Sequence, residues 1–111
     1  MEIIWSNIAT KHLESILEYV EYEFGENTAA KTLSKISDKV KRLSSYPTSG
    51  IKDENYSTSL YTVRHVTIAP NIIYYLCYPD VIVIAAIVHT KQPPRTINSI
   101  LRRFLASYER K

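Results

Sequence analysis

The sequence predicts an α+β domain in which a helix hairpin packs on a mostly antiparallel four-stranded sheet. Apolar, β-branched and aromatic residues fill positions 72–78 and 81–88, and Pro79-Asp80 lies between the two runs. A Pro-Asp pair between such runs indicates a β-hairpin. Two longer segments before it repeat apolar residues at helical spacing. The expected order of elements is therefore β-α-α-β-β-β-α.

Length and composition favour a single folded domain over residues 1–111. The apolar fraction of 45% is ordinary for a globular protein. The single cysteine, Cys77, excludes an internal disulfide and favours a reducing compartment. We see no leader-like start, and no apolar run reaches the ~18–20 residues that a membrane span needs. We therefore expect a cytoplasmic protein without a membrane partner.

The first half of the chain predicts two antiparallel helices after a short strand at residues 1–5. Ser6 is a good N-cap for the first helix, and Gly25 is a plausible stop. Asn27 or Thr28 can cap the second helix, which Tyr46-Pro47 closes. The apolar stripes are Ala9, Leu13, Ile16, Leu17, Val20 and Phe24 in the first helix, and Ala30, Leu33, Ile36, Val40 and Leu43 in the second.

The net charge is only +3, but the charges are unevenly distributed along the chain. Residues 1–30 hold six Glu and one Lys, whereas residues 31–52 hold six Lys or Arg and one Asp. The two helices can pair their opposite charges, or the charges can simply be solvated. A basic second half also allows, without requiring, a nucleic acid partner.

The second half of the chain predicts the sheet and one more helix. Residues 51–59 are polar and suggest a loop, residues 60–68 suggest a strand, and residues 69–71 suggest a turn before the central hairpin. Residues 95–111 carry an apolar stripe and several basic residues, which predicts a basic C-terminal helix. We expect this helix to pack on the sheet. The alternative is a helix that covers a functional site and is displaced.

Several short motifs, in this order, resemble the RelE/ParE superfamily of bacterial toxins. The resemblance covers roughly residues 3–94. It includes Ile3-Ile4-Trp5-Ser6, Phe24-Gly25, Tyr46-Pro47 with Gly50-Ile51, Val63-Arg64 with Ile73-Tyr74-Tyr75, and the segment His89-Thr90-Lys91-Gln92-Pro93-Pro94.

The resemblance implies a growth-inhibiting toxin that a cognate antitoxin neutralises. Two classes of action are open. RelE-like members cut mRNA on the ribosome without a metal or cofactor, and ParE-like members inhibit DNA gyrase without known catalysis. The expected partners are therefore the antitoxin and either the ribosome with its mRNA or DNA gyrase. An inactive member is the third possibility.

Metal-free RNA cleavage requires a proton donor and acceptor and a cation at the phosphate. Arg64 is the candidate phosphate clamp, because a guanidinium makes planar bidentate contacts. His89 is the candidate acid or base, since an unperturbed imidazole has a pKa near ~6.5. By the resemblance, Arg64 matches an Arg that the family often carries on this strand. Endonuclease members often have a His or Tyr near the strand end where His89 lies, whereas the branch that this chain most resembles has Asp there. The candidate RNA-binding residues are Lys52, Lys91, Tyr75 and Arg95.

One departure from the family pattern weakens the nuclease hypothesis. Many RelE-like nucleases carry an Arg where this chain has Ile72.

The other histidines and Cys77 are weaker candidates for a functional site. His65 neighbours Arg64 but should point to the opposite face of the strand, and His12 is expected to be a surface residue. Neither the histidines nor Cys77 have the spacing of a metal site. We therefore predict no metal or cofactor.

Overall fold

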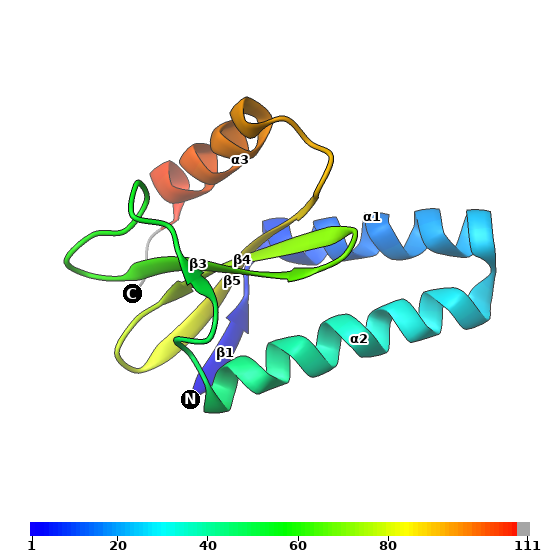
Figure 1. The fold of residues 1–111 in the computed structure, drawn as a ribbon, viewed down its shortest axis with the longest axis horizontal. Helices are drawn as coiled ribbons and strands as arrows, with labels where there is room; N and C mark the ends of the chain where they lie inside the picture. Colours follow the sequence, from blue (N-terminus) through cyan, green and yellow to red (C-terminus); the bar gives the residue numbers. More distant parts are fainter. Residues whose placement is uncertain (109–111) are drawn as a thin grey trace.

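The computed structural model describes residues 1–108. Its elements follow the expected order, with one additional short strand (Figure 1). They are β1 (Glu2–Trp5), α1 (Asn7–Phe24), α2 (Glu26–Ser45), β2 (Ile51–Lys52), β3 (Thr62–Ile68), β4 (Asn71–Cys77), β5 (Val81–His89) and α3 (Pro94–Ser107).

The strands form one five-stranded sheet in the order β1-β5-β4-β3-β2. β1 runs parallel to β5, and the other neighbours are antiparallel, so the α+β class is confirmed. The expected count of four strands is wrong by one. Ile51 and Lys52 pair with His65 and Arg64 as the edge strand β2. A strand of two residues is too short to show the alternation that sequence patterns detect.

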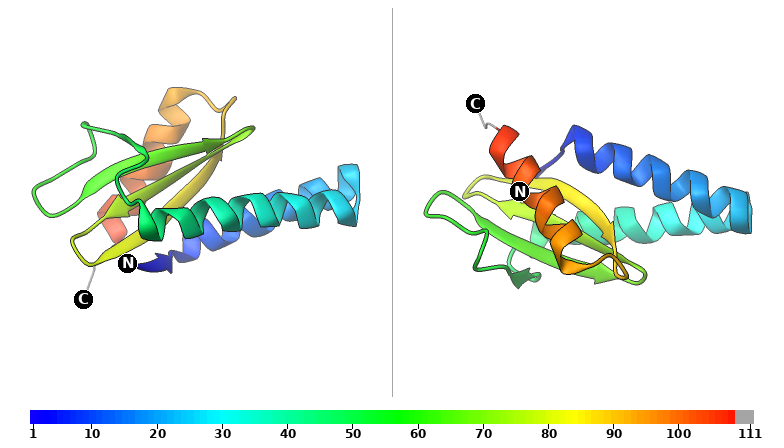
Figure 2. Two further views of the ribbon diagram at one scale, coloured as in Figure 1. Left: turned by 60° about the horizontal axis from the view of Figure 1, so that its bottom comes forward. Right: turned by 90° about the horizontal axis from the view of Figure 1, so that it is seen from above.

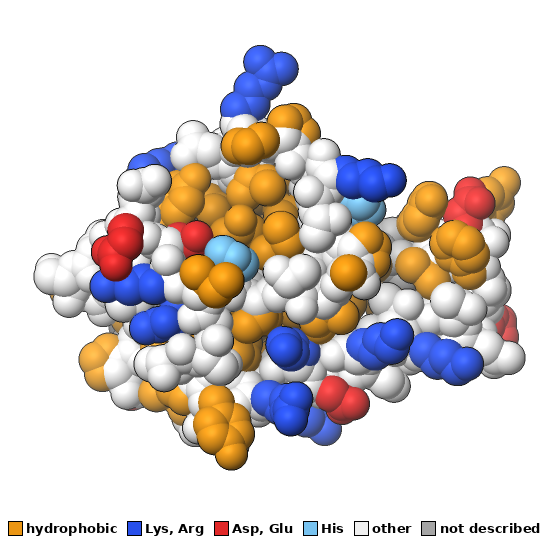
Figure 3. Space-filling view, in the orientation of Figure 1, with side chains coloured by type: hydrophobic (Ala, Val, Ile, Leu, Met, Phe, Trp, Pro, Cys, Tyr) orange, Lys and Arg blue, Asp and Glu red, His pale blue; other side chains and the backbone are white. Residues whose placement is uncertain are grey.

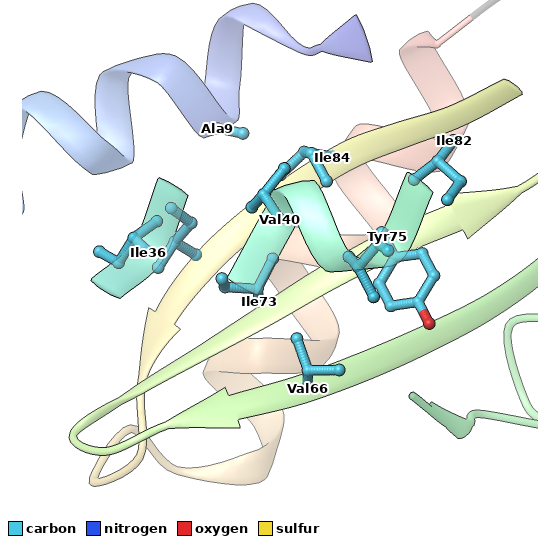
Figure 4. Close-up of a cluster of buried hydrophobic side chains, with 10 residues drawn as sticks. Ala9, Ile36, Val40, Val66, Ile73, Tyr75, Ile82 and Ile84 are labelled. Carbon is cyan, nitrogen blue, oxygen red and sulfur yellow. The ribbon is translucent and has the colours of Figure 1, made fainter. Parts of the chain in front are cut away.

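Helices cover both faces of the sheet (Figure 2). The α1–α2 hairpin packs on one face, where Ile36, Val40 and Ala9 contact strand residues such as Ile73 and Ile84 (Figure 4). On the other face, Leu101 and Phe104 of α3 are buried against the strands, as expected for the C-terminal helix. This double cover explains why the central strands are apolar at nearly every position.

The two long helices are joined by a single residue, Gly25, and only α1 has a side-chain N-cap. The hydroxyl oxygen of Ser6 accepts a hydrogen bond from the amide of Ala9 and caps α1, as predicted. Gly25 ends α1 at φ 92°, a conformation that side chains disfavour. The prediction that Asn27 or Thr28 caps α2 is wrong, because α2 begins directly at Glu26 without a side-chain cap.

A bulge in β5 ties the sheet to α1. Tyr75 pairs with Ile84 and Tyr74 with Ala86, so Ala85 is left without a partner in β4. The Ser6 hydroxyl donates to the carbonyl of Ala85 at 3.1 Å. The side chains of Ser6, the N-cap of α1, and His12, within α1, thus hydrogen-bond to backbone groups of β5 at and beyond the bulge.

The C-terminal helix is shorter than the prediction. α3 ends at Ser107, whereas we expected a helix over residues 95–111. Residues 109–111 lie outside the described part of the chain. None of the helices in residues 1–108 is long and apolar enough to cross a membrane.

Candidate functional site

Arg64 holds the loop between α2 and β2. Its Nη1 donates to the carbonyl oxygen of Gly50 at 2.9 Å and to that of Thr48 at 3.3 Å. Within residues 1–108, Nε is buried and has no hydrogen-bond partner. Nη1 is thus engaged by the loop, which leaves fewer N–H groups of the guanidinium for a bidentate contact with a phosphate. In this structure Arg64 holds its own loop in place.

Tyr75 is fully buried, so the prediction that it stacks on an RNA base is wrong. Its hydroxyl donates to the carbonyl of Pro47 at 2.8 Å and accepts from the amide of Gly50 at 3.0 Å. Burial raises the pKa of this phenol. A Cβ at Gly50 would lie 2.6 Å from the Tyr75 hydroxyl and 2.8 Å from the His65 carbonyl. Close packing therefore requires a glycine after the Tyr46-Pro47 turn.

His89 lies at the opposite end of the sheet and is exposed. Its Nδ1 accepts a hydrogen bond from the amide of Lys91 at 3.0 Å, and its amide donates to Oε1 of Gln92. Lys91 and Arg95 follow on the exposed surface of this connection. The imidazole is accessible to solvent, and its Nδ1 hydrogen bond is to a backbone amide of the following turn.

The predicted catalytic pair is not brought together. Arg64 pairs with Tyr75 of β4, and His89 pairs with Asn71, which lies four positions earlier in the same strand. Two strand spacings and four residues of rise separate the two Cα atoms by roughly 16 Å. Lys52 lies beside Arg64, where its Nζ contacts Glu54 at 3.4 Å. The six candidate residues therefore fall into two groups at opposite ends of the sheet.

His12 is not the surface residue that we expected. Its Nδ1 accepts a hydrogen bond from the amide of Ile87 at 3.1 Å, beside the bulge in β5. Burial lowers the pKa of His12, which keeps the ring neutral and able to accept this bond. The sequence carried no signal for this role, because it depends on β5 extending beyond β1, whose pairing ends at Trp5 and Ile84.

Sequence reasoning also missed an interaction between the side chains of His65 and Asp53. Nδ1 of His65 lies 2.8 Å from Oδ2 of Asp53, and the His65 ring packs against Tyr74. His65 and Arg64 do point to opposite faces, as expected for neighbours in a strand. The pair fastens the loop after β2 to β3.

A groove of about 630 Å³ opens where the helix hairpin extends beyond the sheet. One wall is apolar and comes from α1, and the facing wall is polar and comes from α2. The end of the groove is closed by the turn between β3 and β4 and by His89. Residues that form these walls are Ile16, Tyr19, Val20 and Phe24 on α1, and Thr28, Thr32 and Lys35 on α2.

The apolar wall of this groove is open to solvent. Tyr19 is 61% exposed and Phe24 is 64% exposed, and their rings make an edge contact at 6.5 Å. Hydrophobic side chains also gather over α1 at the right of Figure 3. Exposed aromatic rings above a hollow, with polar groups around them, are typical of a protein-binding surface.

Comparison with known proteins identifies the family. A family model described as the ParE toxin of the type II toxin–antitoxin system parDE matches residues 3–94. The chain belongs to the ParE toxin family. It is thus a type II toxin of the RelE/ParE superfamily, as its motifs suggested. Membership implies a cognate antitoxin as a partner.

A solved structure supports the fold of this ParE toxin. The chromosomal ParDE toxin–antitoxin system from P. aeruginosa contains a chain that matches with a TM-score of 0.66 at 22% identity. The match covers 80% of this chain and 95% of that chain. A search of curated protein sequences finds no significant relative. The family match ends at residue 94, so α3 lies beyond it.

Proposed function

We propose that this ParE toxin inhibits growth by binding a protein target without catalysis, and that the target is DNA gyrase. The observation that carries the proposal is the roughly 16 Å between Arg64 and His89, estimated from strand spacing and rise. Cleavage of RNA needs proton transfer and charge stabilisation at one phosphate. Membership of the ParE family agrees with a gyrase target.

Three further observations disfavour mRNA cleavage. The Arg64 guanidinium donates to loop carbonyls, and the Tyr75 ring is fully buried. Ile72 stands where many RelE-like nucleases carry an Arg. An engaged guanidinium, a buried ring and the absence of the second Arg each support a function other than RNA cleavage.

The experiment is 5′-end mapping of mRNA in a translating bacterial extract that receives the purified chain. We expect the messages to stay intact. We also expect the His89→Ala variant to stop growth as effectively as the unchanged chain does. Cuts confined to ribosome-engaged messages, together with a loss of cleavage of about 10²-fold in His89→Ala, would contradict the proposal.

We also propose that the antitoxin binds the groove between the helix hairpin and the end of the sheet. The exposed rings of Tyr19 and Phe24 provide the apolar anchors that an amphipathic segment needs. Lys35 on the facing wall favours an acidic segment. Family membership supplies the partner, and the groove supplies a surface of suitable chemistry.

Two exposed aromatics of α1 give a matched test. Phe24 lines the groove, whereas Tyr22 is 88% exposed and lies outside it. We expect Phe24→Asp to weaken neutralisation by the co-expressed antitoxin from the neighbouring gene, and Tyr22→Asp to leave it unchanged. Equal neutralisation of both variants would remove the groove as the antitoxin site.

A further inference from the structure

We propose that the exposed side of α2 binds the phosphate backbone of nucleic acid through Lys31, Lys35, Lys39 and Arg42. Lys and Arg side chains form a row over α2 in Figure 3. This contact is additional to the target and antitoxin proposed above, and it does not rest on either. The stripe shares one residue, Lys35, with the groove proposed for the antitoxin, and the variant used in the test leaves Lys35 unchanged.

The four cations form one straight stripe. At 3.6 residues per turn they fall within a sector of about 80° around the helix axis. Ile36, Val40 and Leu43, which are buried against the sheet, point away from this stripe. From Lys31 to Arg42 the stripe is about 16 Å long at 1.5 Å per residue.

The stripe is not neutralised within the protein. Among residues 1–108, Lys52–Glu54 is the one Lys or Arg ion pair with a carboxylate, so no ion pair links α2 to the acidic helix α1. Of the two alternatives for these charges, ion pairing between the helices is therefore not observed within residues 1–108. The acidic residues lie elsewhere, with Glu14, Glu18, Glu21 and Glu26 lining a groove on the other side of the hairpin.

This segregation matters for binding. Glu26 and Leu33, which line the acidic groove, point to the side of α2 opposite the stripe, given a turn of 100° per residue. A polyanion that approaches α2 therefore meets the positive side of the hairpin. Asp38 is the one acidic residue between positions 27 and 45, and it reduces the local charge without dividing the stripe.

The chemistry of this side favours nucleic acid over an acidic protein. Residues that complete it are Asn27, Ser34, Asp38, Lys41 and Ser45. None of them is apolar, whereas a protein interface normally has an apolar core. Contacts to a phosphate backbone need only cations along a line. A row of about 16 Å lets the four cations contact up to four phosphates of a duplex, one for each cation.

The test measures binding of the full chain to a labelled 20-base-pair DNA duplex, by fluorescence anisotropy, between 50 and 200 mM salt. Four phosphate contacts predict a slope of log K against log salt of about −3.6, which is a loss of about 10²-fold in affinity over that range. We expect the variant Lys31→Gln/Lys39→Gln/Arg42→Gln to reduce the slope to about −1.

A matched variant removes the same charge from other surfaces. Lys11, Arg102 and Arg103 are exposed and lie outside α2. We expect Lys11→Gln/Arg102→Gln/Arg103→Gln to keep the slope of the unchanged chain. Circular dichroism on all three proteins establishes that the comparison is between folded chains.

Three results would overturn the proposal. One is the absence of duplex binding at 50 mM salt. Another is an equal loss of slope in both triple variants, which would reflect net charge alone. The third is binding of polyglutamate as tightly as the duplex, which would make an acidic protein the partner. Inhibition of gyrase and neutralisation by antitoxin are measured separately, so their outcomes remain distinguishable from this one.

Discussion

Burial keeps the His12 imidazole neutral, so the stability of the fold depends on pH. The pKa of His12 is lowered in the folded state, so the unfolded chain binds its proton first as the pH falls. The stabilisation is therefore fully present above the unfolded pKa near ~6.5, and it is lost as the pH falls from there toward the folded pKa.

We predict that His12→Gln reduces the pH dependence of stability. A glutamine oxygen can still accept the amide hydrogen of Ile87, but it does not titrate. The measurement is the thermal midpoint at pH 7.5 and pH 5.5 for both proteins. The unchanged chain should lose more stability between these values than the variant, and equal losses would show that His12 does not contribute.

The Tyr75 hydroxyl gives a second prediction. Tyr75→Phe leaves the Gly50 amide and the Pro47 carbonyl without their partner in a buried position. We expect a loss of about 1–3 kcal/mol in the free energy of unfolding. Tyr22→Phe is the control, because that ring is 88% exposed and should change stability by less than about 0.5 kcal/mol. Urea titration measures both, and equal losses would contradict this role.

At the scale of the element, α3 completes the fold. Phe104 and Leu101 cover a sheet face that includes Val63, Leu76 and Val83, all of them buried. We predict that Phe104→Ala costs about 3–5 kcal/mol, as is usual for a buried aromatic. Arg103→Ala, on the exposed side of the same helix, should cost less than about 0.5 kcal/mol.

Hydrogen exchange distinguishes a packed α3 from a displaceable cover. A helix that contributes to the core should exchange its amides about as slowly as β5, in the free and the antitoxin-bound chain. Fast exchange of α3 after antitoxin binding would instead favour the displaced cover. Stability loss in Phe104→Ala and slow exchange of α3 are thus independent readouts of one packing arrangement.

The sequence predicted the long elements well, because their patterns are local. Helical spacing located α1 and α2, and the Pro79-Asp80 turn located β4 and β5. It failed where the structure depends on distant contacts. The strand β2 exists only because β3 lies beside it, and α2 begins at Glu26 because Gly25 alone reverses the chain.

At the scale of the whole molecule, candidate residues were harder to predict than the fold. Arg64 and His89 have suitable chemistry, but register places them at opposite ends of the sheet. Tyr74 and Tyr75 look equivalent in the sequence, yet Tyr75 is the ring that the α2–β2 loop encloses. Which residues converge is decided by tertiary packing, and single-sequence patterns do not contain it.

The arrangement of surfaces favours a binding protein. The hairpin presents an apolar groove on one side and an acidic groove on another, while cations follow the outer side of α2. The residues proposed for RNA cleavage are divided between the α2–β2 loop and the end of β5. A chain of this kind can inhibit its target by occupying it.

The most direct measurement is supercoiling of relaxed plasmid by purified DNA gyrase at increasing ratios of this toxin to enzyme. The reaction contains no ribosome and no mRNA. We predict that supercoiling falls as the toxin approaches equimolar amounts, and that His89→Ala inhibits equally. Unimpaired supercoiling at a large excess of toxin, from a preparation that still stops growth, would contradict the account and return attention to the ribosome.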